Sequence, residues 1–129
     1  MRTAVVGATV LSAAAACAAP GPVEPTAAEL ALGERVYRQC YACHALEPGR
    51  NTPAGPTLHA VVGRAIAGEP GFDYSPALRQ LAAQHALWTP ELLDRFIADP
   101  AVVAPGTEMG YPGLDDPAER RALIAWLSR

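Results

Sequence analysis

The sequence contains no lysine, so its ten basic residues are all arginines, and its formal net charge at pH 7 is −3. Binding to nucleic acid requires a basic face that neutralises phosphates, and this charge balance argues against it. Aromatic residues make up only 6% of the chain. A single domain of this size with so few aromatic side chains builds a modest hydrophobic core unless a large apolar group completes it.

Cysteine and histidine are also scarce, with three of each in 129 residues, but Cys40-Tyr41-Ala42-Cys43-His44 brings three of them together. A structural zinc site takes four ligands, more than this cluster supplies, and no βαβ pattern surrounds the CxxC pair as in dithiol oxidoreductases. CxxCH is the attachment pattern of a c-type haem, in which two thiols bond to the haem vinyl groups and the histidine binds the iron. A dithiol or zinc protein without haem is the alternative at this point.

The first residues have the pattern of an export signal. A positively charged start is followed by an uncharged apolar run that is shorter than the ~20 residues of a membrane-spanning helix. The run ends at Cys17 and resembles a bacterial lipoprotein signal, which is cleaved before a cysteine that is then lipidated. We therefore expect a signal peptide over residues 1–16, a lipid on Cys17 and a flexible Pro/Ala tether over residues 17–25. Ordinary cleavage near Ala19, which would discard Cys17, is the alternative.

Residues 26–129 are predicted to form one all-α domain of about four helices joined by loops rich in proline and glycine. Thr26-Ala27-Ala28-Glu29 has the form of a capping box, so the first helix should begin there and run to about Cys40. Gly33 lies inside this helix, where glycine costs about 1 kcal/mol relative to alanine. We therefore expect another helix to approach closely at this glycine.

Further helices should begin where a capping side chain precedes proline, because proline is pre-organised for the first turn. Three such pairs occur at Ser75-Pro76, Thr89-Pro90 and Asp116-Pro117. Asp99-Pro100 is predicted to end the third helix, since the residue before a proline avoids the helical conformation. The following segment, residues 101–113, has too many prolines and glycines for a long helix, and Met109 lies within it.

Several motifs in order resemble those of class I cytochromes c, over nearly the whole domain from Gly33 to Leu127. These motifs are Gly33-x-x-x-Tyr37-x-x-Cys40-x-x-Cys43-His44, Gly55-Pro56-Thr57-Leu58-His59, Gly63-Arg64, Gly71-Phe72-x-Tyr74, Trp88, Pro105-Gly106-Thr107-Glu108-Met109 and Leu123-Ile124-Ala125-Trp126-Leu127. The resemblance implies the small all-α cytochrome c fold, wrapped around one haem c that is attached through Cys40 and Cys43.

The same resemblance implies the iron ligands. His44 would be the proximal ligand, with its second ring N–H donated to the Pro56 carbonyl, which orients the imidazole and strengthens it as a donor. Met109 would be the distal ligand, and a soft, neutral thioether favours ferrous over ferric iron. His59 and His85 are expected not to bind iron.

Other residues would surround the haem. Tyr74 and Trp88 would donate hydrogen bonds to a haem propionate, and Arg64 would neutralise propionate charge. Phe96 stands where the family often has a tyrosine that faces the haem, and Leu78 stands where it often has an asparagine. Because both changes remove polar groups, we expect a drier distal side and a relatively high potential.

With both axial positions filled, the resemblance implies an electron carrier and not an enzyme. It would carry single electrons between redox protein partners, such as a dehydrogenase or a terminal oxidase, on the outer side of a bacterial membrane. No small-molecule substrate is expected, and the absence of lysine argues against a basic docking surface for an acidic partner. The alternative is a peroxidase-like haem enzyme or a ligand sensor in which Met109 dissociates from the iron.

Overall fold

A computed structural model describes residue 21 and residues 23–129. The predicted signal peptide, Cys17 and most of the predicted tether lie outside these residues. Five helices are present: α1 (Ala27–Tyr37), α2 (Pro76–Gln84), α3 (Pro90–Ala98), α4 (Pro100–Val103) and α5 (Pro117–Leu127). The described residues form no strand beyond an isolated bridge between Ala65 and Leu87, so the predicted all-α class is confirmed. None of the helices in this part of the chain is both long and apolar enough to cross a membrane.

The helices begin at the capping residues that the sequence predicts. The backbone N–H of Glu29 donates to Thr26 Oγ1, and the Glu29 carboxylate accepts the Thr26 N–H at 2.9 Å, so the capping box is confirmed. The side chains of Ser75, Thr89 and Asp116 each accept a backbone N–H from the first turn of the helix that follows.

Two helix boundaries differ from the prediction. Helix α1 ends at Tyr37 instead of near Cys40, because the chain continues as tight turns in which Cys40 N donates to Tyr37 O at 2.8 Å. Asp99-Pro100 ends α3 as predicted, but it also begins the single-turn helix α4, which the sequence pattern did not predict. Asp99 can do both because its backbone is extended while its side chain accepts the Val102 N–H.

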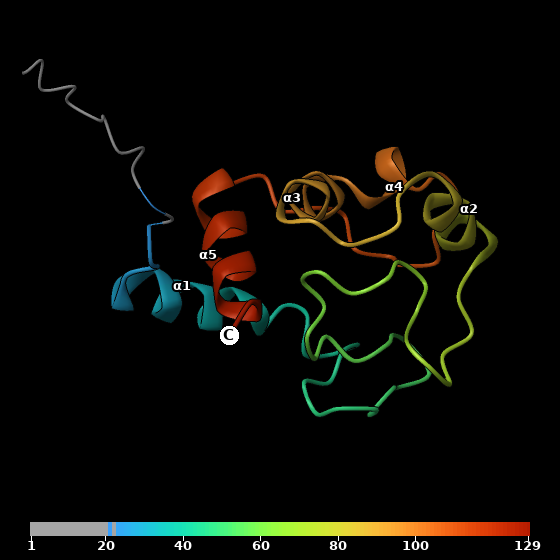
Figure 1. Cartoon of the computed structure of the whole chain (residues 1–129), viewed down its shortest axis with the longest axis horizontal. Coiled ribbons are helices and arrows are strands. Elements are labelled where there is room, and N and C mark those ends of the chain that lie inside the picture. Colours follow the sequence, from blue (N-terminus) through green and yellow to red (C-terminus); the bar gives the residue numbers. More distant parts are fainter. Residues whose placement is uncertain (1–20, 22) are drawn as a thin grey trace, which may run out of the picture.

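Helices α1 and α5 cross at close range (Figure 1). A β-carbon on Gly33 would collide with the carbonyl oxygen of Ala122 and would lie 2.6 Å from Trp126 Cβ. The rings of Tyr37 and Trp126 pack beside this contact with their centroids 5.0 Å apart. The predicted close approach at Gly33 is therefore confirmed, and it explains why this position lacks a side chain.

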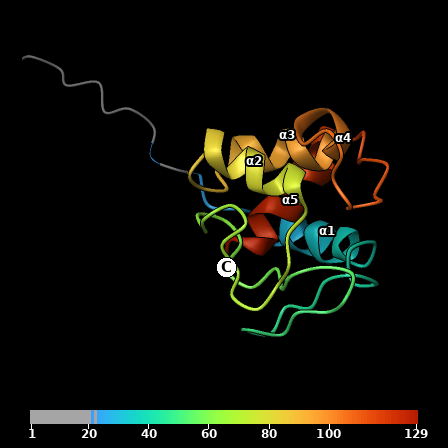
Figure 2. The same ribbon diagram turned by 90° about the vertical axis from the view of Figure 1, so that its right-hand side faces the viewer.

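The helices and the long loops occupy different sides of the molecule. Helix α5 packs against both α1 and α3, while α2, α3 and α4 gather together away from α1 (Figures 1 and 2). The irregular chain between α1 and α2, drawn in green, faces α2 and α3 from below in both views. This arrangement places the CxxCH segment and the loop after α4 around a shared interior.

Candidate functional site

A cavity of about 950 Å³ lies between the helices and the long loops. Its volume is at the upper end of the range of about 300–1,000 Å³ that is typical of ligand sites. Much of its wall is apolar, with contributions from Leu58, Val61, Leu78, Leu93, Phe96, Ile97, Leu123 and Leu127. The charged side chains that line it are Arg64, Asp73 and Glu108. The cavity therefore suits one large, mostly apolar group that carries a few polar substituents.

Every site residue predicted within the described part of the chain lines this cavity. These residues are Cys40, Cys43, His44, Pro56, Arg64, Tyr74, Trp88, Phe96 and Met109. The structure places the other two histidines elsewhere, since His59 lines a small separate pocket beside Trp126 and His85 caps the end of α2. Cys17, the predicted lipidation site, lies outside the described residues.

The two thiols are presented by the turns that follow α1. The backbone N–H groups of Cys43 and His44 both donate to the carbonyl of Cys40 at 3.0 Å, so the motif winds tightly. Burial, followed by the proximity of Cys43, raises the pKa of the Cys40 thiol to about 11. Both cysteines are free of disulfide bonds and both line the same cavity, as attachment of one group at two points requires.

The imidazole ring of His44 is oriented by a single hydrogen bond. Its Nδ1 lies 2.7 Å from the Pro56 carbonyl oxygen, so the proton belongs on Nδ1 and the lone pair on Nε2. Burial lowers the pKa of His44, although the bond to Pro56 acts in the opposite direction. A neutral, oriented imidazole is the form that binds a metal. A β-carbon on Gly55 would lie 2.6 Å from His44 Cε1, so this glycine leaves room for the ring.

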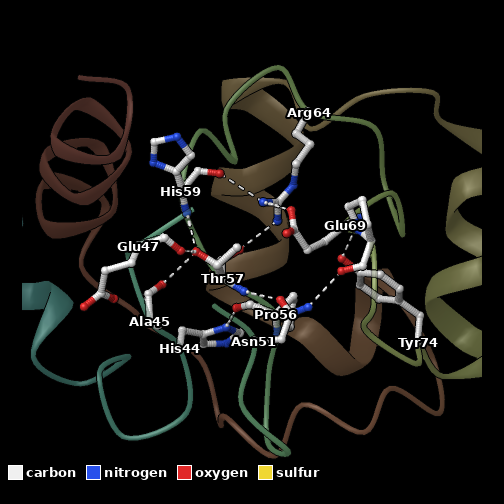
Figure 3. A network of polar contacts seen from close by, with 11 residues as sticks. His44, Ala45, Glu47, Asn51, Pro56, Thr57, His59, Arg64, Glu69 and Tyr74 are labelled. Carbon is white, nitrogen blue, oxygen red and sulfur yellow. Dashed lines mark hydrogen bonds and ion pairs between the residues drawn. The ribbon is translucent and has the colours of Figure 1, made fainter. Parts of the chain in front are cut away.

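A polar network behind His44 ties the loops together (Figure 3). The side chain of Asn51 accepts the Thr57 N–H at 3.0 Å and donates to Pro70 O at 2.9 Å. Thr52 Oγ1 donates to Cys43 O at 2.7 Å. The sequence did not single out Asn51 or Thr52, because polar residues in a Pro/Gly-rich loop give no local sign of their partners.

Arg64 is enclosed by acceptors on one side and faces the cavity on the other. Its NH1 donates to Glu69 Oε2 at 2.9 Å and to His59 O at 3.0 Å, and its NH2 donates to Thr57 O at 2.9 Å (Figure 3). Among the buried side-chain nitrogen and oxygen atoms of the described residues, Nε of Arg64 is the one without a hydrogen-bond partner. Glu69 and its ion pair with Arg64 were not predicted.

Met109 approaches the cavity from the loop after α4. It is partly buried, and its backbone N–H donates to Thr107 Oγ1 at 3.3 Å. The hydroxyl of Tyr111 donates to Gln39 Oε1 at 3.0 Å, which joins this loop to the residue before Cys40. Tyr111 also lines the cavity and was not predicted, since nothing local in the sequence relates it to Gln39.

The helical wall of the cavity is apolar. Trp88 and Phe96 are 7% exposed, and their ring centroids are 5.0 Å apart. Leu78 and Phe96 both line the cavity, at the two positions where the sequence led us to expect lost polarity. The wall thus adds no hydroxyl or amide at either position.

The residues present fit a haem. The cavity is large and apolar, two thiols and a neutral imidazole line it, and the unpartnered Nε of Arg64 can donate to an acidic substituent. The described residues hold no group of three or more His, Cys, Asp and Glu placed to bind a metal ion.

Comparison with known proteins identifies close relatives. No family model matches the chain. Cytochrome c2 of Rhodomicrobium vannielii is 35% identical over 99% of this chain and 94% of its own length. Cytochrome c2 of Blastochloris viridis is 36% identical over 100% of this chain and 94% of its own length.

Solved structures agree with these relatives. Cytochrome cH from Methylobacterium extorquens superimposes with a TM-score of 0.69 and 37% identity, over 76% of this chain and 95% of that one. Cytochrome c2 from Rhodospirillum centenum gives a TM-score of 0.67 and 31% identity, over 76% and 94% of the two chains. The chain therefore belongs to the class I monohaem cytochrome c family, whose members are electron-transfer proteins and not enzymes, and it carries one haem c attached through Cys40 and Cys43.

Proposed function

We propose that this cytochrome carries single electrons with His44 and Met109 as the two axial ligands of its iron. One observation carries the proposal: these two side chains, from segments far apart in the sequence, line the same cavity as both cysteines. The bound haem supplies a ferric–ferrous couple that gains and loses one electron. The chain's own part is to bind the iron at two positions, orient the ligands and exclude water.

Each of the two iron ligands has neighbouring groups that suit it to bind the iron of an electron carrier. The Pro56 carbonyl accepts the Nδ1 proton of His44, which leaves Nε2 for the iron, and Gly55 leaves the ring room to adopt this orientation. Met109 provides a neutral sulfur, and the apolar wall that includes Phe96 disfavours the extra charge of the ferric state. The neutral sulfur ligand and the apolar wall both favour a relatively high reduction potential of the haem.

We assign the propionate side of the haem to Arg64, Tyr74 and Trp88. Arg64 offers its unpartnered Nε and a positive charge. The Tyr74 hydroxyl accepts the Glu69 N–H at 3.3 Å, which leaves its own O–H to donate, and burial raises its pKa, so the proton is retained at neutral pH. Trp88 has an indole N–H that acts as a donor.

The ligand assignment is tested by replacing Met109. A Met109→Ala variant should lose the sulfur-to-iron charge-transfer band of the ferric protein and should bind cyanide and carbon monoxide on mixing, whereas the wild type should bind neither. Val102→Ala, which shortens a side chain that is 73% exposed near the same loop, is the matched control and should behave as wild type. A retained band in Met109→Ala would refute the assignment. Rapid cyanide binding by the wild type would favour a ligand sensor or a peroxidase-like enzyme.

From the sequence alone, we also propose the cellular setting. Residues 1–16 would direct export, Cys17 would carry a lipid, residues 17–25 would form a tether, and residues 26–129 would exchange electrons with donor and acceptor proteins outside the cell membrane. The intact mass of the mature protein tests this directly. A mass with one haem and a diacylglycerol on a chain that begins at Cys17 is expected. A haem-bearing chain that begins after Ala19 would exclude the anchor and leave the electron carrier intact.

A further inference from the structure

The ion pair between Arg64 and Glu69 stands apart from the other ion pairs of the described residues. Its side chains are 16% and 11% exposed, whereas the three other pairs each have a partner that is at least 37% exposed. Removing two charges from water costs several kcal/mol per ion, and their attraction does not reliably repay this cost. A pair as shielded as this one is therefore weak evidence for a role in stability and invites a functional explanation.

Glu69 contacts two of the three residues that we place on the propionate side of the haem, Arg64 and Tyr74. Its carboxylate accepts NH1 of Arg64 at 2.9 Å, and its backbone N–H donates to the Tyr74 hydroxyl at 3.3 Å (Figure 3). Arg64 and Tyr74 line the cavity, and Glu69 lies behind them. With NH1 and NH2 occupied by Glu69 and two backbone carbonyls, the guanidinium plane is fixed while its Nε keeps no protein partner.

We propose that Glu69 is a positioning residue that also tunes the haem: it holds Arg64 with Nε available to a propionate, and its carboxylate lowers the reduction potential. The negative charge offsets the guanidinium charge, and in a poorly polarisable interior it stabilises the ferric state, which carries one positive charge more than the ferrous state. This inference rests on the propionate role proposed above for Arg64.

The test is a redox titration of the haem-bearing protein. Glu69→Gln keeps the size of the side chain and one acceptor oxygen but removes the charge, so the midpoint potential should rise. We expect the ferrous-to-ferric ratio at a fixed applied potential to increase up to about tenfold, which for one electron is about 59 mV. Glu34→Gln, on the exposed face of α1, is the matched control and should leave the potential unchanged.

Two more variants distinguish the tuning role of Glu69 from the propionate role of Arg64, on which it rests. Arg64→Gln should lower the potential, and the double variant Arg64→Gln/Glu69→Gln should have a higher potential than Arg64→Gln alone. The double variant removes both members of the ion pair together, so neither side chain is left as an unpaired charge, and it keeps the test open if Glu69→Gln does not fold. If Arg64→Gln lowers the potential but neither removal of Glu69 raises it, the tuning role of Glu69 is refuted and Arg64 keeps its role. If Arg64→Gln leaves the potential unchanged, both assignments are refuted.

Discussion

Replacing Gly55 by alanine should disturb the iron site through a single added methyl group. Gly55 does not have a left-handed backbone, so alanine is opposed there by contacts alone. The new β-carbon would lie 2.6 Å from His44 Cε1, 2.7 Å from His44 Nδ1 and 2.8 Å from the Cys43 carbonyl oxygen. All three atoms belong to the haem-attachment motif, which covalent haem prevents from moving far. The imidazole must therefore turn or shift.

The size of the effect follows from these contacts. Overpacking a tight interior costs about 1–3 kcal/mol. A displaced imidazole also loses its 2.7 Å hydrogen bond to Pro56, worth about 0.5–1.5 kcal/mol. We expect the free energy of unfolding to fall by about 2–4 kcal/mol in total, and the ferric absorption spectrum and the midpoint potential to change. The measurements are urea unfolding followed by circular dichroism, absorption spectroscopy and a redox titration.

Gly33→Ala provides the matched control, because it overpacks a contact of the same kind away from the iron. Its β-carbon would collide with Ala122 and Trp126 at the crossing of α1 and α5. The overpacking cost of about 1–3 kcal/mol is partly offset by a gain of about 1 kcal/mol in helix propensity. This variant should lose stability while keeping the wild-type spectrum and potential. A Gly55→Ala protein with wild-type stability, spectrum and potential would refute the reasoning.

Three further predictions concern other contacts. Phe96→Tyr places a hydroxyl in the apolar wall, so the midpoint potential should fall in a redox titration, and the free energy of unfolding should fall by about 1–3 kcal/mol if the hydroxyl finds no partner. Tyr111→Phe removes the bond to Gln39, so the Met109 loop should open more readily. The slow cyanide binding that follows long incubation of the ferric protein, and not mixing, should be about two- to tenfold faster than in the wild type by absorption spectroscopy, from a lost hydrogen bond of about 0.5–1.5 kcal/mol. Glu29 accepts hydrogen bonds from Thr26 that lower its pKa from 4.5, so its contribution is present above pH 4.5 and disappears as the pH falls through the folded-state pKa. Thermal unfolding should therefore show Glu29→Ala to be less stable than the wild type at neutral pH, with the difference shrinking in acid.

Each of these three predictions has an outcome that would contradict it. A raised potential in Phe96→Tyr would mean that the apolar wall does not favour the ferrous state. Unchanged cyanide kinetics in Tyr111→Phe, with Tyr41→Phe as the exposed control, would show that the link to Gln39 does not restrain the loop. A stability difference for Glu29→Ala that persists in acid would show that the carboxylate charge is not what the helix start depends on.

The structural features that the sequence determined by itself arise from interactions between residues that are close together in the chain. A capping oxygen followed by proline marks the start of a helix because both groups act within one turn, which is why the starts after Ser75, Thr89 and Asp116 were predicted. The CxxCH motif is likewise a local pattern whose chemistry lies in its spacing. Asp99-Pro100 shows the limit of such signals, because the same pair ends one helix and begins the next.

Contacts between distant loops were decided only by the tertiary structure. Gln39 and Tyr111, 72 positions apart, meet because α1 and the loop after α4 reach the same cavity. In the sequence Glu69 resembles any other carboxylate in a loop, yet the fold partly buries it against Arg64 and Tyr74. Irregular segments have no periodic pattern that indicates which side chains point inward. The burial and the partners of these side chains therefore depend on which distant parts of the chain pack against the loop. The sequence alone thus specified the haem-attachment motif and the order of the four longer helices, and the tertiary structure decided which polar groups surround the haem cavity.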